Sequence, residues 1–387
     1  MKRYIHFIEV TTALMLALFT TFAAAAQVES ATDTESLLAQ IDALTKRVES
    51  IEAQNSAAKS AAFYTPNLYG SMLAYFNVNT YDGDQRFAVR NAHVGVRGNA
   101  SNRLSYCTQV NFHNLGKVSV LDAYMRYKGG KFDLTIGQQW THLTTDLDRT
   151  GPKSSIFTSR SYGAIYSLAY TDGTTVKNFG NRDIGLYGNY TLGNTLPVTL
   201  SLGLFNGAGA NSVEWDDDIN ITGRLQIGAA KGLSGGVSIY SGSTAFDQDV
   251  TIWSGEARWV GEALFVEANY QQKDVDIVGL GERTRTLLVE SYYTIKAPKS
   301  KIFDSYVPAL RYDYGEGMLF TNASSDEPEA LDAGRITAQM GFMLKGAKIR
   351  SRLSLSYEKC FMDERPTDYA ENPLFQDRVT AAVTVAF

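Results

Sequence analysis

Charged side chains of both signs recur at alternating positions of this chain, and they are its main source of chemistry. In "KIRSRLSLSYEKC", Arg350 and Arg352 fall on the same parity as Glu358. Guanidinium groups bind carboxylates and phosphates through paired hydrogen bonds, so a row of them can attract and orient anions. Rings of one charge select ions, whereas mixed charges cancel much of the field. The pattern indicates that these charged side chains attract or repel small ions or solutes.

The histidines and serines form no recognisable catalytic motif. His93, His113 and His142 lie outside any H-E-x-x-H pattern. The one match to G-x-S-x-G, "GLSGG" at residues 232–236, opens a predicted strand and is not the strand-to-helix elbow that a nucleophilic serine needs. A Ser–His site assembled by folding stays open, but nothing singles one out. The acidic segments 214–218 and 324–332 could hold divalent cations, although solvated loop charge is the simpler interpretation. We therefore predict no enzyme, no cofactor and no metal site.

The elements that carry these charges alternate between apolar and polar residues. In "ITAQMGFML", Ile336, Ala338 and Met340 oppose Thr337 and Gln339, and this period of two predicts β-strands. Sixteen strands are predicted, at residues 66–79, 86–98, 102–113, 117–128, 131–140, 182–193, 197–206, 219–229, 233–241, 250–260, 263–272, 283–296, 306–315, 332–345, 347–359 and 376–387.

The connections between these strands favour a membrane barrel over a soluble sandwich. Most connections after even-numbered strands are tight, whereas many after odd-numbered strands are long, and the longest is 141–181. Short turns on one side and long loops on the other are typical of outer-membrane barrels. No backbone edge can remain unpaired in hydrocarbon, so the sheet must close. We predict an all-β fold, a 16-stranded antiparallel transmembrane β-barrel over residues 66–387, wide enough for an aqueous channel.

The 141–181 connection is too long for a simple external loop. We predict that it folds into the lumen, where Arg149, Lys153 and Arg160 form a charged constriction. A solvated external lid is the alternative.

Parity also predicts which wall residues line the pore. The predicted pore-lining arginines are Arg97, Arg103, Arg126, Arg224, Arg258, Arg311, Arg335, Arg350 and Arg352. Inward acids are nearly as many: Asp122, Asp133, Asp183, Glu256, Glu267, Asp313 and Glu358. The mixture leaves the sign of ion selectivity open. Arg335, Arg350 and Arg352 are the best candidates for a local basic strip that serves an anion path.

The N-terminal region has a different pattern. Residues 1–26 carry Lys2, Arg3, an apolar run and alanines, which predicts a signal peptide rather than a membrane anchor. Residues 27–65 are predicted to form a coiled-coil helix and a linker. The heptad seam consists of Leu37, Ile41, Leu44, Val48 and Ile51. A dimer or a trimer fits this seam, and a single amphipathic helix on a surface is the alternative.

Composition agrees with an exported β protein. The chain has 33 Gly, 22 Tyr and 19 Phe, with a formal charge of −5, and its mild acidity argues against a nucleic-acid partner. Two cysteines make no disulfide framework, so free thiols are expected, with one bridge as the alternative.

The chain ends "DRVTAAVTVAF", which predicts a closing strand whose terminal Phe387 looks like the assembly signal of outer-membrane barrels.

These features together resemble the phosphate-selective porin O and P family. "RFAVRNAHVGVRGNASNRLSYCTQVNF" (86–112) is similar to an early arginine-bearing hairpin of that family, and "LDAYMRYKGGKFDLTIGQ" (121–138) to the hairpin that feeds the constriction loop. "SRSYG" (159–163) resembles a segment inside that loop, and "GNRDIGLYGNY" (180–190) the strand after it.

The resemblance implies a homotrimeric porin in the outer membrane of a Gram-negative cell, surrounded by the lipid bilayer. Its channel would pass small hydrophilic solutes and ions by passive diffusion, and type members prefer anions through inward arginines. A non-conducting barrel that acts in adhesion or cell-envelope attachment is the alternative. Phosphate specificity is the weaker expectation, because this chain mixes arginines with acids.

Overall fold

The computed structural model describes residues 39–50, 63–114, 117–149, 151, 154–166, 181–213, 219–243, 249–277, 280–321, 328–346, 351–362 and 375–387. The chain divides into two compact units, Met1–Tyr64 and Thr65–Phe387. Across the described residues, no helix combines the length and the apolar character needed to cross a membrane.

The first unit contains a helix over residues 39–50. Ile41, Leu44 and Val48 of the predicted seam are exposed on it. Leu37 and Ile51 lie outside the described residues, so the coiled coil stays a prediction.

The second unit is one antiparallel sheet of seventeen labelled segments. They are β1 (Asn67–Asn79), β2 (Gln85–Asn99), β3 (Leu104–Asn114), β4 (Lys117–Lys128), β5 (Phe132–Trp140), β6 (Arg182–Leu192), β7 (Val198–Phe205), β8 (Asn220–Gly228), β9 (Gly232–Ser243), β10 (Asp249–Val260), β11 (Leu264–Ile277), β12 (Leu280–Tyr293), β13 (Ile295–Lys296), β14 (Phe303–Thr321), β15 (Pro328–Leu344), β16 (Arg352–Phe361) and β17 (Arg378–Ala386). Because β12 and β13 pair in turn with the same strand, β14, they count as one barrel strand. The predicted 16-stranded antiparallel barrel is therefore confirmed.

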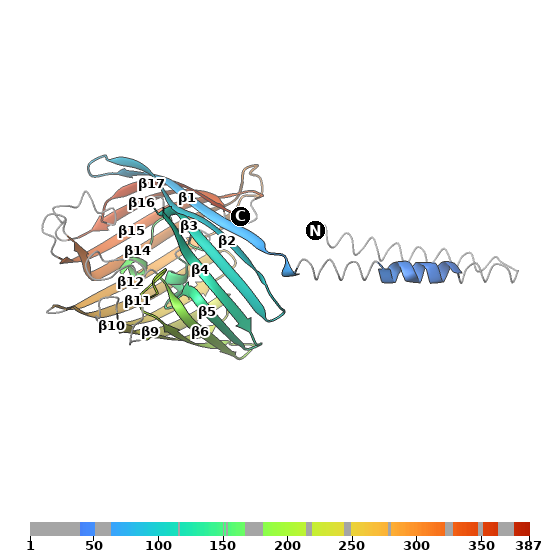
Figure 1. Cartoon of the computed structure of the whole chain (residues 1–387). Helices are drawn as coiled ribbons and strands as arrows, with labels where there is room; N and C mark the ends of the chain where they lie inside the picture. Colours follow the sequence, from blue (N-terminus) through green and yellow to red (C-terminus); the bar gives the residue numbers. More distant parts are fainter. Residues whose placement is uncertain are drawn as a thin grey trace. The chain divides into compact units, whose positions relative to one another are not determined.

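The sheet closes on itself through β1, which pairs with both β2 and β17 (Figure 1). The β1–β17 register runs from Ser71 opposite Ala386 to Asn79 opposite Arg378. Beyond it, the backbone N–H of Gly70 donates to the Phe387 carbonyl at 3.0 Å, and the N–H of Phe387 donates back at 3.2 Å. Closure of this kind leaves no unpaired edge.

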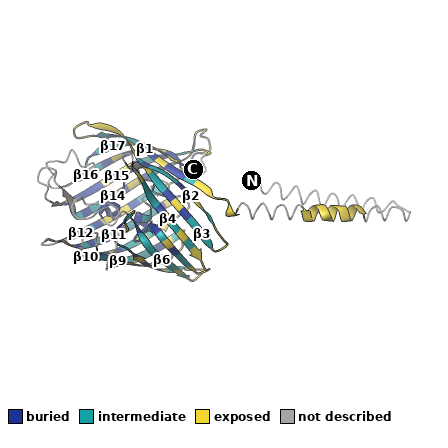
Figure 2. Cartoon of the chain, viewed as in Figure 1, coloured by how far each residue is buried: buried dark blue, intermediate teal, exposed yellow. Residues whose placement is uncertain are grey.

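Burial is inverted relative to a water-soluble protein (Figure 2). On β16, Arg352, Ser354 and Glu358 are buried, whereas Leu353 and Leu355 are exposed. The polar parity thus faces the interior and the apolar parity faces outward, as in barrels whose outer surface contacts hydrocarbon.

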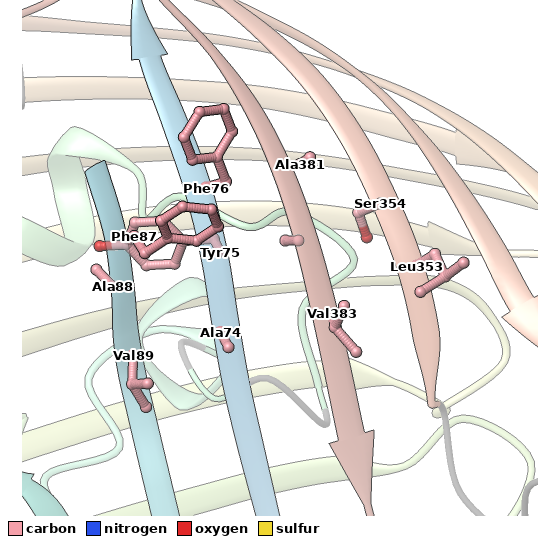
Figure 3. Close-up of a pocket in the computed structure, with 11 residues that line it drawn as sticks. Ala74, Tyr75, Phe76, Phe87, Ala88, Val89, Leu353, Ser354, Ala381 and Val383 are labelled. Atoms are coloured by element: carbon pink, nitrogen blue, oxygen red, sulfur yellow. The ribbon is translucent and has the colours of Figure 1, made fainter. Parts of the chain in front are cut away.

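An apolar groove of about 650 Å³ lies at the closing seam (Figure 3). Ala74 on β1 and Ala381 on β17 are small, and they lie among the larger side chains of Phe76, Leu353 and Val383. Parity places these five side chains outward. The groove therefore belongs to the apolar outer surface and not to the polar interior.

Candidate functional site: the polar interior and its loop

The loop after β5 packs against the interior of the barrel through two short helices. α3 (Thr145–Asp148) is capped by Thr144, whose hydroxyl accepts a hydrogen bond from the Leu147 N–H at 3.2 Å. α4 (Tyr162–Tyr166) is buried throughout. Three apolar clusters join the loop to the wall, for example Leu143, Leu147 and Ala164 with Tyr240 and Ile252. Residues 167–180 of the predicted loop lie outside the described residues.

The first polar anchor joins α3 to β8 and β10. Glu256 accepts hydrogen bonds from the N–H and the hydroxyl of Thr145, at 2.7 and 2.9 Å. Arg224 donates to Thr145 at 2.9 Å, and it also pairs with Glu256 and with Asp148. Burial opposes ionisation of Asp148, but His142 and Arg224 outweigh it and hold the pKa of that carboxyl below its ordinary value.

The second anchor is Arg149, which follows α3. Its guanidinium lies 2.8 Å from Glu290, 2.9 Å from Glu267 and 4.7 Å from the centre of the Phe265 ring. The Arg149–Glu267 contact is an ion pair without a hydrogen bond. Burial disfavours the charged guanidinium, but Glu290 and Glu267 outweigh it and raise the pKa of Arg149 above its ordinary value.

Asp146, on the same helix, is a buried carboxylate that accepts a hydrogen bond from the Ser161 hydroxyl. Burial, with the neighbouring charge of Glu290, raises the pKa of Asp146 to about 6. The titration midpoint of this acid therefore lies about one pH unit below neutral, so it is mostly ionised at pH 7.

The third anchor is a buried network of arginines and acids on β14, β15 and β16. Arg335 lies 2.8 Å from Asp313, 3.2 Å from Glu358 and 4.5 Å from the centre of the Tyr162 ring, and it donates to the Arg160 carbonyl. Asp313 also accepts the Tyr162 N–H at 3.0 Å.

Arg311 extends this network along the loop. It donates to the carbonyl and the hydroxyl of Ser159 at 3.0 and 2.6 Å, and it lies 4.7 Å from the centre of the Phe157 ring. Each of these wall charges therefore has a partner, as buried charges require.

A fourth set of contacts holds residues 155–158. Gln339 accepts from the N–H of Thr158 at 2.9 Å and donates to the Ile156 carbonyl. Arg352 donates to the Ser155 carbonyl at 2.8 Å, and Arg90 donates to the Thr158 carbonyl. The described part of the loop is thus bound to the wall from β8 to β16 and to β2.

The predicted pore-lining arginines fall into two groups. Arg224, Arg311, Arg335 and Arg352 hold the loop, and neither Arg335 nor Arg352 has solvent-exposed surface. Of the predicted constriction residues, Arg149 is ion-paired and Arg160 is half-buried, with its carbonyl bound by Arg335. Lys153 and Arg350 lie outside the described residues.

The second group has no carboxylate partner among the described residues. Its members are Arg97, Arg103, Arg126 and Arg258. Arg97 is exposed and lies 5.2 Å from the centre of the Tyr69 ring. Arg126 donates to the Thr135 hydroxyl at 3.0 Å. Arg103 donates to the Tyr127 hydroxyl at 3.2 Å, and Arg258 is half-buried.

Sequence reasoning missed Arg90 and Gln339. A β-bulge in the β1–β2 register, where Leu73 opposes Asn91 but Ala74 opposes Val89, places Arg90 outside the residue-by-residue register and changes the parity. No sequence pattern marks that bulge. Gln339 lies on the predicted inward parity, so its direction was predictable, but its loop partners were not.

A closed sixteen-strand barrel with a polar interior and a loop packed inside it has the architecture of a porin. The model of the family described as phosphate-selective porin O and P matches residues 68–195, which confirms the resemblance to that family. No curated protein matches the chain.

Solved structures with a similar fold include outer-membrane proteins of three organisms. A Salmonella typhi OmpF complex with daunomycin has 14% identity and a TM-score of 0.59, covering 84% of this chain and 98% of that one. The outer-membrane channel DcaP of Acinetobacter baumannii has 14% identity and a TM-score of 0.52, covering 83% and 97%. OmpT of Vibrio cholerae, in a trimer form, has 13% identity and a TM-score of 0.52, covering 84% and 99%. At this identity the likeness concerns the fold.

Proposed function

We propose that this protein is an outer-membrane channel through which small hydrophilic solutes diffuse passively, with a preference for anions. The observation that carries the proposal is the uneven pairing of inward charges. The carboxylates that hold the loop lie against guanidinium groups, whereas Arg97 on β2 and Arg126 on β4 have no described acid partner.

The acids on the strands near these two arginines do not compensate them fully. Asp122 is paired with Arg182 at 2.8 Å, and Asp133 lies opposite Lys128 in the β4–β5 register. Paired charges contribute little field at a distance, whereas unpaired charges of one sign select ions. The wall formed by β2 to β4 is therefore the part of the lumen that we expect to favour anions.

The remaining parts of the proposal concern assembly and location. We propose that residues 1–26 export the chain to the outer membrane, that residues 27–65 form the coiled coil and linker, and that three barrels associate. The porin fold and the family match support this placement. The trimer form of the Vibrio cholerae protein, which has a similar fold, supports the homotrimer. A constriction lined by Arg149, Lys153 and Arg160 is part of the same proposal.

The test is the reversal potential of the protein in a planar bilayer under a salt gradient. We expect the reversal potential of the native protein to indicate a preference for anions. In the Arg97→Gln/Arg126→Gln variant we expect the reversal potential to shift toward cation preference. The matched control is Arg283→Gln/Arg285→Gln, which removes the same two positive charges from pairs with Asp274 and Glu316 that parity places outside the lumen. An unchanged potential in the double variant would refute the assignment of selectivity to these arginines. Folded protein that does not conduct would favour the adhesion or envelope-attachment alternative.

A further inference from the structure

Two tyrosines and two arginines surround one thiol on the wall formed by β1 to β4. The Tyr69 hydroxyl on β1 lies 3.0 Å from Sγ of Cys107 on β3, and Cys107 is opposite Tyr124 on β4. Arg97 lies 5.2 Å from the Tyr69 ring centre, and Arg126 lies 5.4 Å from the Tyr124 ring centre. We call these five residues the Tyr–Arg platform.

Two glycines leave the wall flat beneath this platform. A Cβ atom on Gly95 would lie 2.6 Å from Cζ of Tyr69, so the Tyr69 ring lies directly against the backbone of β2. Gly137 on β5 has a φ of 121°, and a Cβ there would meet the Ala123 carbonyl at 2.3 Å. Both positions require glycine for close approach. The Tyr69 ring therefore lies along the wall against β2, and Gly137 lets the backbones of β4 and β5 approach closely beside Tyr124.

The platform offers two kinds of contact at once. Arg97 is exposed and Arg126 is half-buried, and neither has an acid partner among the described residues, so their N–H groups can bind a carboxylate through paired hydrogen bonds. The Arg97 guanidinium lies over the Tyr69 ring and the Arg126 guanidinium over the Tyr124 ring, and a guanidinium face held by a tyrosine in this way stacks on flat π systems. A small inorganic anion would use only the guanidinium groups, whereas a flat ring that carries a carboxylate would use both.

We infer that the Tyr–Arg platform is a binding subsite for planar aromatic carboxylates on the route through the channel. This inference rests on the proposed channel function for its role in transport. Binding at the platform does not depend on conductance, so the subsite inference and the channel proposal can fail separately.

The experiment compares benzoate with cyclohexanecarboxylate, which has the same charge and a similar size but no aromatic face. Binding to the folded full-length protein in detergent is measured by equilibrium dialysis, and solute-induced interruptions of single-channel current are measured in a bilayer. We expect benzoate to bind about fivefold more tightly than cyclohexanecarboxylate. We also expect Arg97→Gln/Arg126→Gln to lose binding of both acids.

Tyr69→Leu/Tyr124→Leu separates the aromatic contribution from charge. It should retain binding of cyclohexanecarboxylate and lose the preference for benzoate. Tyr190→Leu, at an exposed position of β6, is the control for loss of a tyrosine. Equal binding of the two acids by the native protein would overturn the inference, as would a benzoate preference that survives both double variants. Benzoate binding without conductance would instead contradict the channel proposal and leave the subsite in place.

Discussion

Arg335 shows how a full positive charge can lie in the barrel without access to water. Its guanidinium is fully buried and is bound by Asp313, by Glu358 and by the Arg160 carbonyl of the loop. Removing one member of such a network leaves buried charges without their partner, which is far more costly than losing an exposed pair.

We predict that Arg335→Met lowers the free energy of unfolding by about 3–5 kcal/mol and loosens the loop. The measurement is thermal unfolding of the folded barrel, followed by the loss of its compact form in electrophoresis. Arg285→Met is the matched control, because its pair with Glu316 is half-exposed and should change stability by under about 1 kcal/mol. Equal effects of the two substitutions would contradict the anchoring role of Arg335.

The raised pKa of Asp146 predicts that this residue makes the stability of the fold depend on pH with the opposite sign from that of an ordinary ion-paired acid. Its pKa of about 6 in the folded state lies above the ordinary value of 3.8, so the ionised form opposes folding at neutral pH and protonation relieves this as pH falls through 6. Asp146→Asn should therefore be at least as stable as the native protein at pH 7.5, and its advantage should vanish by about pH 4.

Asp148 provides the comparison within the same helix. Its pKa is lowered in the folded state, so it stabilises the protein above its ordinary pKa, and this contribution is lost as pH falls below that value. Asp148→Asn should accordingly destabilise the protein at pH 7.5. Melting temperatures measured from pH 2 to 8 test both variants, and parallel curves for the two would refute the assignment.

At the scale of elements, the closing strand depends on a glycine in its neighbour. A Cβ on Gly70 would lie 2.3 Å from the Phe387 ring, so the ring covers this glycine. We predict that deletion of Phe387, or Gly70→Val, reduces the fraction of protein assembled in the outer membrane more than it alters the conductance of assembled molecules. The control is Gly255→Val, whose Cβ would meet nothing within 4 Å. Normal assembly after deletion of Phe387 would contradict its role as an assembly signal.

The strands were predictable because each alternates between an apolar outer surface and a polar interior. β16 shows this directly, with Arg352 and Glu358 inward and Leu355 outward. The ends of some strands were not predictable. β11 and β14 extend to Ile277 and Thr321, beyond the predicted 263–272 and 306–315. Polar residues occupy both parities in "QQKDVDI", which removes the alternation that a strand prediction needs.

The partners of the inward charges were beyond sequence reasoning. Parity placed Arg335 and Arg352 inward, but the exposure of these side chains depends on where the loop packs. Arg160 of the loop, which Arg335 contacts, is over 170 residues away from Arg335 in the sequence. The Tyr69–Cys107 contact likewise joins β1 to β3 across β2, and it depends on the barrel register and on the close approach of the Tyr69 ring to Gly95. Such contacts depend on tertiary packing, which a local period does not encode.

At the scale of the whole molecule, the apolar seam of the N-terminal helix predicts self-association. Ile41, Leu44 and Val48 are exposed on residues 39–50, and a heptad seam is buried only against another helix. We predict that deletion of residues 35–54 lowers the melting temperature of the proposed trimer, measured by semi-native electrophoresis. Replacement of Asp42 and Lys46, an exposed pair on the same helix, by alanine is the control. An unaltered melting temperature after the deletion would favour a tether to another envelope component.

We propose that the closed barrel encloses a conducting path past the anchored loop. Single-channel recording of the purified, folded protein in a planar bilayer tests it most directly. We expect discrete conductance steps and, under a salt gradient, a reversal potential on the anion-selective side. Folded protein that inserts into the bilayer and gives no conductance steps would contradict it.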